Sequence, residues 1–266
     1  MMDDLPRGWK KEELGKKLSI LSGFAFKSAG FSKNPEDGIP LIRIRDIITQ
    51  KPDTFFTGKV PLGYEISSGD ILIGMDGDFH LRKWQAGKAL LNQRICKVSS
   101  ADPSSLDNDY LYYFLAPELS RIHSGIAATT VKHLSTKHLK TIIANLPPLP
   151  EQKKIAEVLS SVDEAIAATK AVIDQTKQVK KGLLQTLLTR GIGHTKFKQT
   201  ELGEIPESWE VVCLEEIALV ERGKFSARPR NDPKYYGGDI PFIQTGDVVS
   251  SNGILRKHRQ TLNEHG

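Results

Sequence analysis

Two aspartates beside a glycine are the first residues in this chain whose types suggest catalysis. Asp76, Gly77 and Asp78 lie in a polar segment, and Lys83 follows a few residues later. A metal-dependent nuclease needs carboxylates and a lysine close together, so the segment could bind Mg²⁺. The match is loose, because such a nuclease takes its carboxylates from separate strand ends, and two acids beside a glycine usually form a turn. We expect no catalysis here.

A second segment superficially resembles the Asn-Pro-Pro-aromatic motif of adenine methyltransferases. Residues 145–149 read Asn-Leu-Pro-Pro-Leu. The motif needs the asparagine next to the prolines and an aromatic side chain that stacks on a flipped base. Leu146 separates the asparagine from the prolines, and Leu149 stands where the aromatic is needed. No glycine-rich nucleotide loop accompanies the segment. We interpret it as a proline-rich hinge.

The histidines do not form a recognisable metal site either. His133 and His138 are five residues apart, so they would not share a helix face as a metal-binding histidine pair does. Neither cysteine is near enough to complete a site. The sequence therefore offers no credible catalytic centre.

Basic and polar side chains suit binding better than catalysis. Arg43 and Arg45 alternate in an apolar segment, and on one strand face their guanidinium groups could reach guanine edges or phosphates. A solvated outer face explains the same pattern, and these residues alone leave both interpretations open. Further candidates for DNA contact are Lys27, Arg82, Lys83, Thr130, Lys132 and His133.

The chain that carries these residues nearly repeats itself after about 200 residues. Pro6-Arg7-Gly8-Trp9 returns as Pro206-Glu207-Ser208-Trp209, and the segment from Ile39-Pro40 returns from Ile240-Pro241. Solenoid repeats have much shorter units, so we interpret the pattern as a domain written twice, with only the start of the second copy present. Gln244 and Thr245 stand near the positions of Arg43 to Arg45. The framework is kept and the candidate contacts differ, as expected of two domains that read different sequences.

Residues 1–150 are predicted to form an α+β domain rich in short strands. Alternating apolar residues predict strands at residues 39–48, 71–73 and 89–98, with a polar loop at 76–84. Ser105 or Asp107 is expected to cap a helix that ends before Gly125. That helix would carry to the core Tyr110, Leu111, Phe114 and Leu115.

Residues 151–190 are predicted to form one long helix that acts as a spacer. It contains no proline, and its apolar residues recur with steps of four and three, a heptad pattern that packs against a partner helix. At 1.5 Å per residue it would be roughly 60 Å long. Residues 191–266 would then be a linker and an incomplete second domain. The stripe comprises Ile155, Leu159, Val162, Ile166, Thr169, Ile173 and Thr176, and resumes after Lys180 at Leu183 and Leu187.

Composition agrees with a soluble protein that can bind nucleic acid. Hydrophobic residues make up 39% of the chain and charged residues 26%. Residues 1–150 carry 20 Lys and Arg against 16 Asp and Glu, and this excess permits DNA binding without requiring it. The sequence shows no signal peptide and no apolar run long enough to span a membrane. Cys96 and Cys213 are expected to be reduced, which indicates the cytoplasm.

Taken together, these segments resemble the specificity subunits of type I restriction-modification systems, over nearly the whole chain. The resemblance rests on the Trp9 and Trp209 openings, the 39–45 strand, and two further segments, Gly69-Asp70-Ile71-Leu72 leading to Met75–Phe79, and Leu91-Asn92-Gln93-Arg94. The segment at 146–157 that opens the long helix resembles the family most strongly.

The resemblance implies a role in DNA recognition without catalysis. Members of this family carry two target recognition domains, separated by long antiparallel helices, and each domain reads half of a split site in double-stranded DNA from its major-groove side. Modification subunits bind the helices and methylate adenine with S-adenosylmethionine. Restriction subunits add translocation and cleavage, driven by ATP with Mg²⁺. No cofactor is expected in the specificity chain.

The incomplete second copy is a departure from this family pattern. The chain could be a fragment, a truncated gene product, or one half of a homodimer that pairs two long helices. Two other functions stay open: the recognition part of a fused restriction-methylation enzyme, and a coiled-coil assembly protein that does not read DNA.

Overall fold

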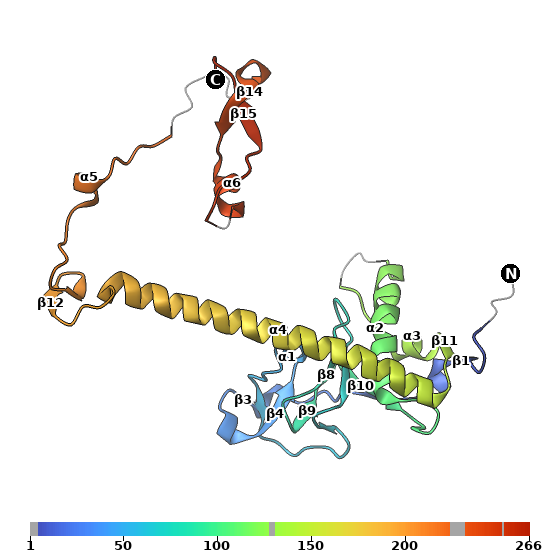
Figure 1. The fold of residues 1–266 in the computed structure, drawn as a ribbon. Helices are drawn as coiled ribbons and strands as arrows, with labels where there is room; N and C mark the ends of the chain where they lie inside the picture. The colour runs from blue at the N-terminus through green and yellow to red at the C-terminus, as the bar shows by residue number, and fades with distance from the viewer. Residues whose placement is uncertain (1–4, 128–130, 224–231, 252) are drawn as a thin grey trace. The chain divides into compact units, whose positions relative to one another are not determined.

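Two units, residues 1–178 and 179–266, make up the computed structural model (Figure 1), and each is described by itself. The structure describes residues 5–127, 131–223, 232–251 and 253–266. The first unit is a mixed, strand-rich α+β domain, as the sequence predicts, and its strands form two main sheets. None of the helices in the described ranges is long and apolar enough to cross a membrane.

A four-stranded antiparallel sheet carries the larger core. Its order is β2 (Leu18–Ser22), β10 (Ile95–Ser100), β7 (Ile71–Gly74) and β8 (Leu81–Lys83). The turn before β7 forms as predicted: the Ser67 N–H donates to the Asp70 carboxylate, and Gly69 adopts φ 97°. Residues 76–84 were predicted to be a loop. That prediction was wrong from Leu81 on, because an apolar Leu81 and a fully buried Trp84 hold this stretch in the sheet.

The second sheet has five short strands. Its order is β3 (Phe31–Ser32), β5 (Phe55–Phe56), β4 (Ile39–Ile42), β9 (Ala89–Leu91) and β6 (Glu65–Ile66), with β4 and β9 parallel. The single strand predicted at 89–98 is therefore two strands in two sheets. The polar residues 92–94 separate β9 from β10, and a 3-10 turn, η2 (Ser28–Gly30), precedes β3. Another, η3 (Pro35–Asp37), follows it.

The strand predicted at 39–48 ends at Ile42. Residues 44–49 form α1 (Ile44–Thr49) instead, and Arg43 is the residue before its first turn. The Arg43 N–H donates to Asp46 Oδ2 at 2.9 Å, which satisfies a backbone donor at the helix start. Ile44 and Ile47, three residues apart, then face the same core cluster. The alternating pattern was ambiguous because a spacing of three also suits one helical turn.

Helix α2 (Asn108–Gly125) packs against the core that the four-stranded sheet carries. Asp107 caps α2 by accepting bonds from the N–H groups of Asp109 and Tyr110, both at 2.9 Å. Gly125 is the last residue of α2 rather than the residue after it. A small sheet of β1 (Lys10–Glu13) and β11 (Ile143–Leu146), with η1 (Leu14–Lys16) and α3 (Thr136–Lys140), completes the unit.

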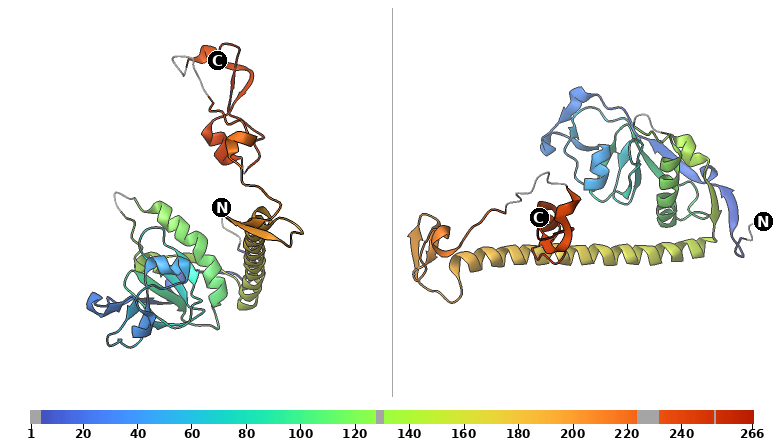
Figure 2. Two further views of the ribbon diagram at one scale, coloured as in Figure 1. Left: turned by 90° about the vertical axis from the view of Figure 1, so that its left-hand side faces the viewer. Right: turned by 90° about the horizontal axis from the view of Figure 1, so that it is seen from above.

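The predicted long helix is present as α4 (Leu149–Arg190), 42 residues that begin two residues earlier than expected. Proline is tolerated in a first helical turn, and Pro150 lies there. The Pro148 carbonyl accepts the N–H groups of Glu151 and Gln152. Gln152 and Ala156 are buried against the rest of the first unit, and the views of Figure 2 show the described residues that precede α4 on one side of its N-terminal part. Gly191, at φ 64°, follows the helix.

The second unit contains short elements after the end of α4. β12 (Phe197–Thr200) pairs with β13 (Gly203–Pro206), and α5 (Leu214–Ile217) follows. Further on, η4 (Pro233–Tyr235) leads into β14 (Tyr236–Phe242), α6 (Thr245–Ser250) and β15 (Gln260–Leu262), with β14 and β15 antiparallel. The segment β14–α6 has the same order, strand then short helix, as β4–α1.

Candidate nucleic-acid interface

Three arginines gather at one cleft of the first unit, which we call the arginine cleft. Its volume is about 570 Å³, and it lies where η2, β3, the start of α1 and the turn between β9 and β10 meet. Three segments that are distant in sequence therefore contribute to one surface. The cleft is lined by Phe26, Ser28, Phe31, Arg43, Ile44, Arg45, Asn92, Gln93 and Arg94.

Arg43 and Arg45 reach the arginine cleft from the junction of β4 and α1, not from one strand face. The Arg43 guanidinium carbon lies 5.6 Å from the centre of the Phe31 ring, a cation–π distance. Arg45 forms an ion pair with Asp53, and its Nε lies 3.5 Å from Asp46 Oδ1. Both side chains are thus held by neighbours while their donors stay near the surface. Arg43 and Arg45 lie together as predicted, but the prediction that they share one strand face was wrong.

Arg94 enters the arginine cleft from the turn between β9 and β10. Its backbone has φ 69°, a left-handed conformation that is uncommon for residues other than glycine. The Met75 N–H donates to the Arg94 carbonyl at 2.8 Å, which helps to hold this conformation. Asp76 Oδ2 accepts a bond from the Arg94 guanidinium at 2.7 Å, and Asp76 Oδ1 lies 2.7 Å from His133 Nδ1. Asp76 therefore ties the segment of His133 to the cleft.

The carboxylates that pair with Arg45 and Arg94 have shifted pKa values. The hydrogen bond from Arg45, with others from Thr54 and Lys33, holds the pKa of Asp53 well below its usual range. Burial raises the pKa of Asp46, against the opposing bonds from the Arg43 N–H and Arg45. Burial also acts to raise the pKa of Asp76, but bonds from His133 and Arg94 outweigh it and the pKa is lowered. Asp53 and Asp76 thus remain ionised partners of their arginines at neutral pH.

The acidic loop that was considered for nuclease chemistry is used differently in the structure. Asp76 is occupied by Arg94 and His133, and Asp78 lies 3.9 Å from His123 Nε2. Within the described ranges, no group of three or more His, Cys, Asp or Glu side chains could hold a metal ion.

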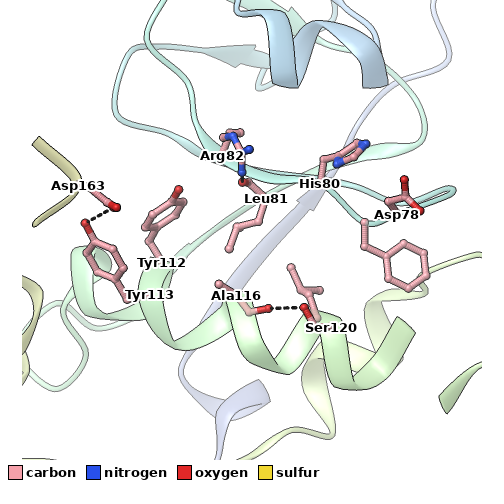
Figure 3. Close-up of a pocket in the computed structure, with 11 residues that line it drawn as sticks. Asp78, His80, Leu81, Arg82, Tyr112, Tyr113, Ala116, Ser120 and Asp163 are labelled. Carbon is pink, nitrogen blue, oxygen red and sulfur yellow. Dashed lines mark hydrogen bonds between the residues drawn. The ribbon is translucent and has the colours of Figure 1, made fainter. Parts of the chain in front are cut away.

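A second cleft, the tyrosine cleft, contains another of the predicted residues. It has a volume of about 400 Å³ and lies between the β7–β8 hairpin, α2 and α4. Figure 3 shows Arg82 and His80 across from Tyr112, with the Tyr113 hydroxyl donating to Asp163 Oδ2 of α4 at 2.9 Å. Burial, followed by the bond to Asp163, raises the pKa of Tyr113 to about 12. This bond attaches α4 to α2 within the first unit.

The other predicted contacts are spread over the surface. Lys27 is exposed and stands between two residues that line the arginine cleft. Lys83 pairs with Asp109 at 2.8 Å and lies 5.0 Å from the Tyr112 ring centre. Lys132 donates to the His123 carbonyl at 2.6 Å. Thr130 lies outside the described residues.

In the second unit, the two predicted residues open α6. Gln244 precedes the helix, and its Nε2 donates to Gln260 Oε1 at 2.6 Å, while Thr245 is the first helical residue. Both are exposed.

The apolar stripe of α4 is open to solvent over most of its length. Ile155 packs against the core of the first unit, but the later members of the predicted stripe are exposed: Leu159, Val162, Ile166, Ile173, Leu183 and Leu187. Further exposed apolar residues widen it, and these are Val158, Val172, Val179, Leu184 and Leu188. We call these eleven exposed residues the α4 stripe.

The prediction from sequence missed Gln93 and Arg94 as candidate contacts. Together with Asn92 they form three consecutive polar residues that interrupt the apolar run at 89–98. Such an interruption marks a turn rather than a continuous strand. Their proximity to Arg43 follows from the parallel pairing of β4 with β9, a long-range contact that the sequence alone does not specify.

The family model of the type I restriction modification DNA specificity domain matches residues 6–178. Among curated proteins, the chain is similar to the type I restriction enzyme EcoBI specificity subunit of Escherichia coli. It is 37% identical to that protein over 253 residues, which cover 91% of this chain and 50% of the relative. The chain therefore spans about half the length of this relative.

Solved structures share the fold at low sequence identity. One is described as the structural basis underlying complex assembly and conformational transition of the type I R-M system. It matches with a TM-score of 0.53 and 24% identity over 70% of this chain and 46% of that chain. The type I restriction-modification S subunit from M. genitalium matches with a TM-score of 0.52 and 18% identity, over 70% of this chain and 47% of that one.

Proposed function

The chain belongs to the type I restriction modification DNA specificity family, and from this premise we propose that its first unit reads one half of a split site in double-stranded DNA. The chain acts as the specificity part of a larger complex and is not itself the catalyst. The reading surface is the arginine cleft, with Lys27 beside it. The other half of the site is read by the domain that begins in the second unit.

The arginine cleft is the observation that carries this proposal. Arg43 and Arg45, from the junction of β4 and α1, and Arg94, from the turn between β9 and β10, converge on one surface. Guanidinium groups bind phosphates and guanine edges in two-pronged geometry, and arginine is the usual residue for this task. Each of the three has an aromatic or acidic neighbour that restrains it, so less side-chain freedom is lost when DNA binds.

We also propose that the α4 stripe packs against a second long helix and that α4 docks modification subunits. Exposed apolar patches of this length mark sites of protein association. A second copy of this chain can supply the partner helix, which would give a homodimer. Catalysis then resides in the partners: modification subunits with S-adenosylmethionine, and restriction subunits with ATP and Mg²⁺.

Salt-dependent DNA binding tests the reading surface. The chain with its modification subunits is titrated with duplex DNA at several salt concentrations, and the Arg45→Ala, Arg94→Ala double variant is compared with wild type. The slope of log affinity against log salt is negative, and loss of two phosphate contacts should make it shallower by about two. Arg121→Ala is the matched control, because Arg121 is an exposed arginine of α2 paired with Glu118.

Two results would contradict the proposal of a DNA-reading surface. One is a salt slope of the Arg45→Ala, Arg94→Ala variant equal to that of Arg121→Ala, when thermal unfolding shows that the double variant is folded like wild type. The other is a wild-type complex that ignores DNA at low salt, which would favour an assembly protein.

Sedimentation tests the helix partner. At micromolar concentration we expect a dimer of wild type, and a monomer when Ile166 and Ile173 of the α4 stripe are replaced by aspartate. Wild-type monomers at this concentration would rule out the homodimer.

A further inference from the structure

The same strand-to-helix junction occurs in both units of the chain. In the first, the Arg43 N–H donates to Asp46 Oδ2 at 2.9 Å, and in the second the Gln244 N–H donates to Asp247 Oδ2 at 3.0 Å. Arg43 has φ −100° and ψ 163°, and Gln244 has φ −108° and ψ 162°. Both aspartates are buried, at 1% and 3% exposed. The two junctions therefore present residues 43 and 244 on one backbone frame.

An arginine stands beside the buried aspartate in both junctions, although it comes from different places in the sequence. Arg45 Nε lies 3.5 Å from Asp46 Oδ1, and Arg259 Nε lies 3.5 Å from Asp247 Oδ1. Gly246 occupies the helix position that corresponds to Arg45. A Cβ atom placed on Gly246 would lie 3.8 Å from the Arg259 guanidinium. The guanidinium of Arg259 therefore lies near the place where the side chain of an arginine at position 246 would leave the backbone.

Strand pairing shows which residue of the first unit corresponds to Arg259. Pro40 pairs with Phe55, and Pro241 pairs with Thr261. Counting back two residues on each partner strand equates Arg259 with Asp53. Helix α1 supplies the cation in the first unit, and in the second the residue just before β15 supplies it, so the positive charge lies beside the buried aspartate in both although its sequence position differs.

What differs between the junctions is the side chain at residues 43 and 244. Arg43 is restrained by the Phe31 ring, and Gln244 by the side chain of Gln260. A cation present in both junctions suits a phosphate contact, because phosphates carry no sequence information. A side chain that differs between the junctions on the same backbone conformation suits contact with base edges. Arginine pairs in two-pronged fashion with guanine, and glutamine with adenine.

We propose that residues 43 and 244 are specificity-determining: Arg43 selects guanine at one position of one half-site, and Gln244 selects adenine at one position of the other. Asp46 and Asp247 are positioning residues, and Arg45 and Arg259 bind the adjacent phosphates. This inference rests on the proposed function, since it assigns bases within a site that the chain must first read. Each of the two selections is worth about 5- to 150-fold in affinity.

Enrichment from a randomised duplex library tests the assignment. The full chain, assembled with its modification subunits, is incubated with the library, and the retained DNA is sequenced for wild type, Arg43→Gln and Gln244→Arg. We expect Arg43→Gln to change one guanine of one half-site to adenine, and Gln244→Arg to change one adenine of the other half-site to guanine. Arg121→Gln and Gln199→Arg, at exposed positions outside both junctions, should retain the wild-type sequences.

Each alternative outcome has a definite meaning. Both variants retaining the wild-type motif would overturn the inference and leave the proposed function intact. Variants that retain no sequence at all would also overturn it, because a residue that chooses between bases must alter the preference rather than abolish binding. A wild-type complex that enriches no split motif would instead contradict the proposed function.

Discussion

Replacing Gln152 tests how the long helix is joined to the recognition domain. Gln152 is 1% exposed, and its side chain makes three hydrogen bonds to backbone groups. Its Oε1 accepts the Asp107 N–H at 2.9 Å, and its Nε2 donates to the Ser105 carbonyl at 3.0 Å and the Pro147 carbonyl at 2.9 Å. One buried amide thus connects α4, the proline-rich hinge and the cap of α2.

The magnitude follows from the groups that Gln152→Ala leaves without partners. One backbone N–H and two carbonyls lose their bonds, and each buried group without a partner costs about 1–3 kcal/mol. The three groups sum to about 3–9 kcal/mol. Only the bond to Pro147 is fully buried, and single substitutions rarely cost more than about 5 kcal/mol, so we expect a loss of roughly 3–5 kcal/mol in the free energy of unfolding. For a unit of this size that lowers Tm by roughly 6–20 °C.

Thermal unfolding and amide hydrogen exchange measure the effect of Gln152→Ala. The Asp107 amide should exchange faster in the variant, because its acceptor is gone. Gln178→Ala is the matched control, since it makes the same substitution at an exposed position of α4. Surface changes usually fall within about 0.5 kcal/mol, so a Gln152→Ala variant that unfolds within about 0.5 kcal/mol of Gln178→Ala would show that the three bonds do not stabilise the fold.

Gln152→Glu separates the two roles of the amide. Glutamate keeps an acceptor for the Asp107 N–H but faces two carbonyls without the Nε2 donor. Burial beside carbonyls should raise its pKa in the folded state above the unfolded value of about 4.3. Stability relative to wild type should therefore fall as pH rises from about 4 through the raised pKa. Urea unfolding across this range checks the sign, and a deficit that does not change with pH would contradict it.

Two further predictions concern buried groups. Burial raises the pKa of Cys96 to about 12, whereas Cys213 is exposed, so a thiol reagent should modify one cysteine per native chain and two after denaturation. Asp76→Asn removes an ionised partner of Arg94 whose pKa is lowered in the fold. The resulting loss of stability should be present at pH 7 and shrink as pH falls below about 4, where the unfolded carboxyl protonates. Urea midpoints measure this, with Asp78→Asn as control, and a deficit unchanged at low pH would count against it.

Local signals predicted much of the fold. The heptad spacing and absence of proline predicted α4, and Asp107 was identified as a possible cap of α2. The junction at Arg43 was missed because Ile42, Ile44 and Asp46 also fit a strand pattern. The bond from the Arg43 N–H to Asp46 is a local contact, but the choice between strand and helix also depends on packing of Ile44 and Ile47 against the core, which is a tertiary effect.

The candidate site was predictable only in part. Arg43 and Arg45 were identified from residue type, and they do share a cleft. Arg94 joins them through the parallel pairing of β4 with β9, and no local pattern contains that pairing. The exchange of Arg45 for Arg259 beside the buried aspartate was likewise invisible, because the two arginines occupy different places in the repeat.

We propose that this chain directs methylation to a split DNA sequence. Single-molecule sequencing of a genome that carries this locus with its modification subunits maps every methylated adenine. We expect a motif of two short half-sites separated by a fixed gap, and loss of that motif when this chain is deleted. Methylation that persists unchanged without the chain, or a continuous motif with no gap, would contradict it.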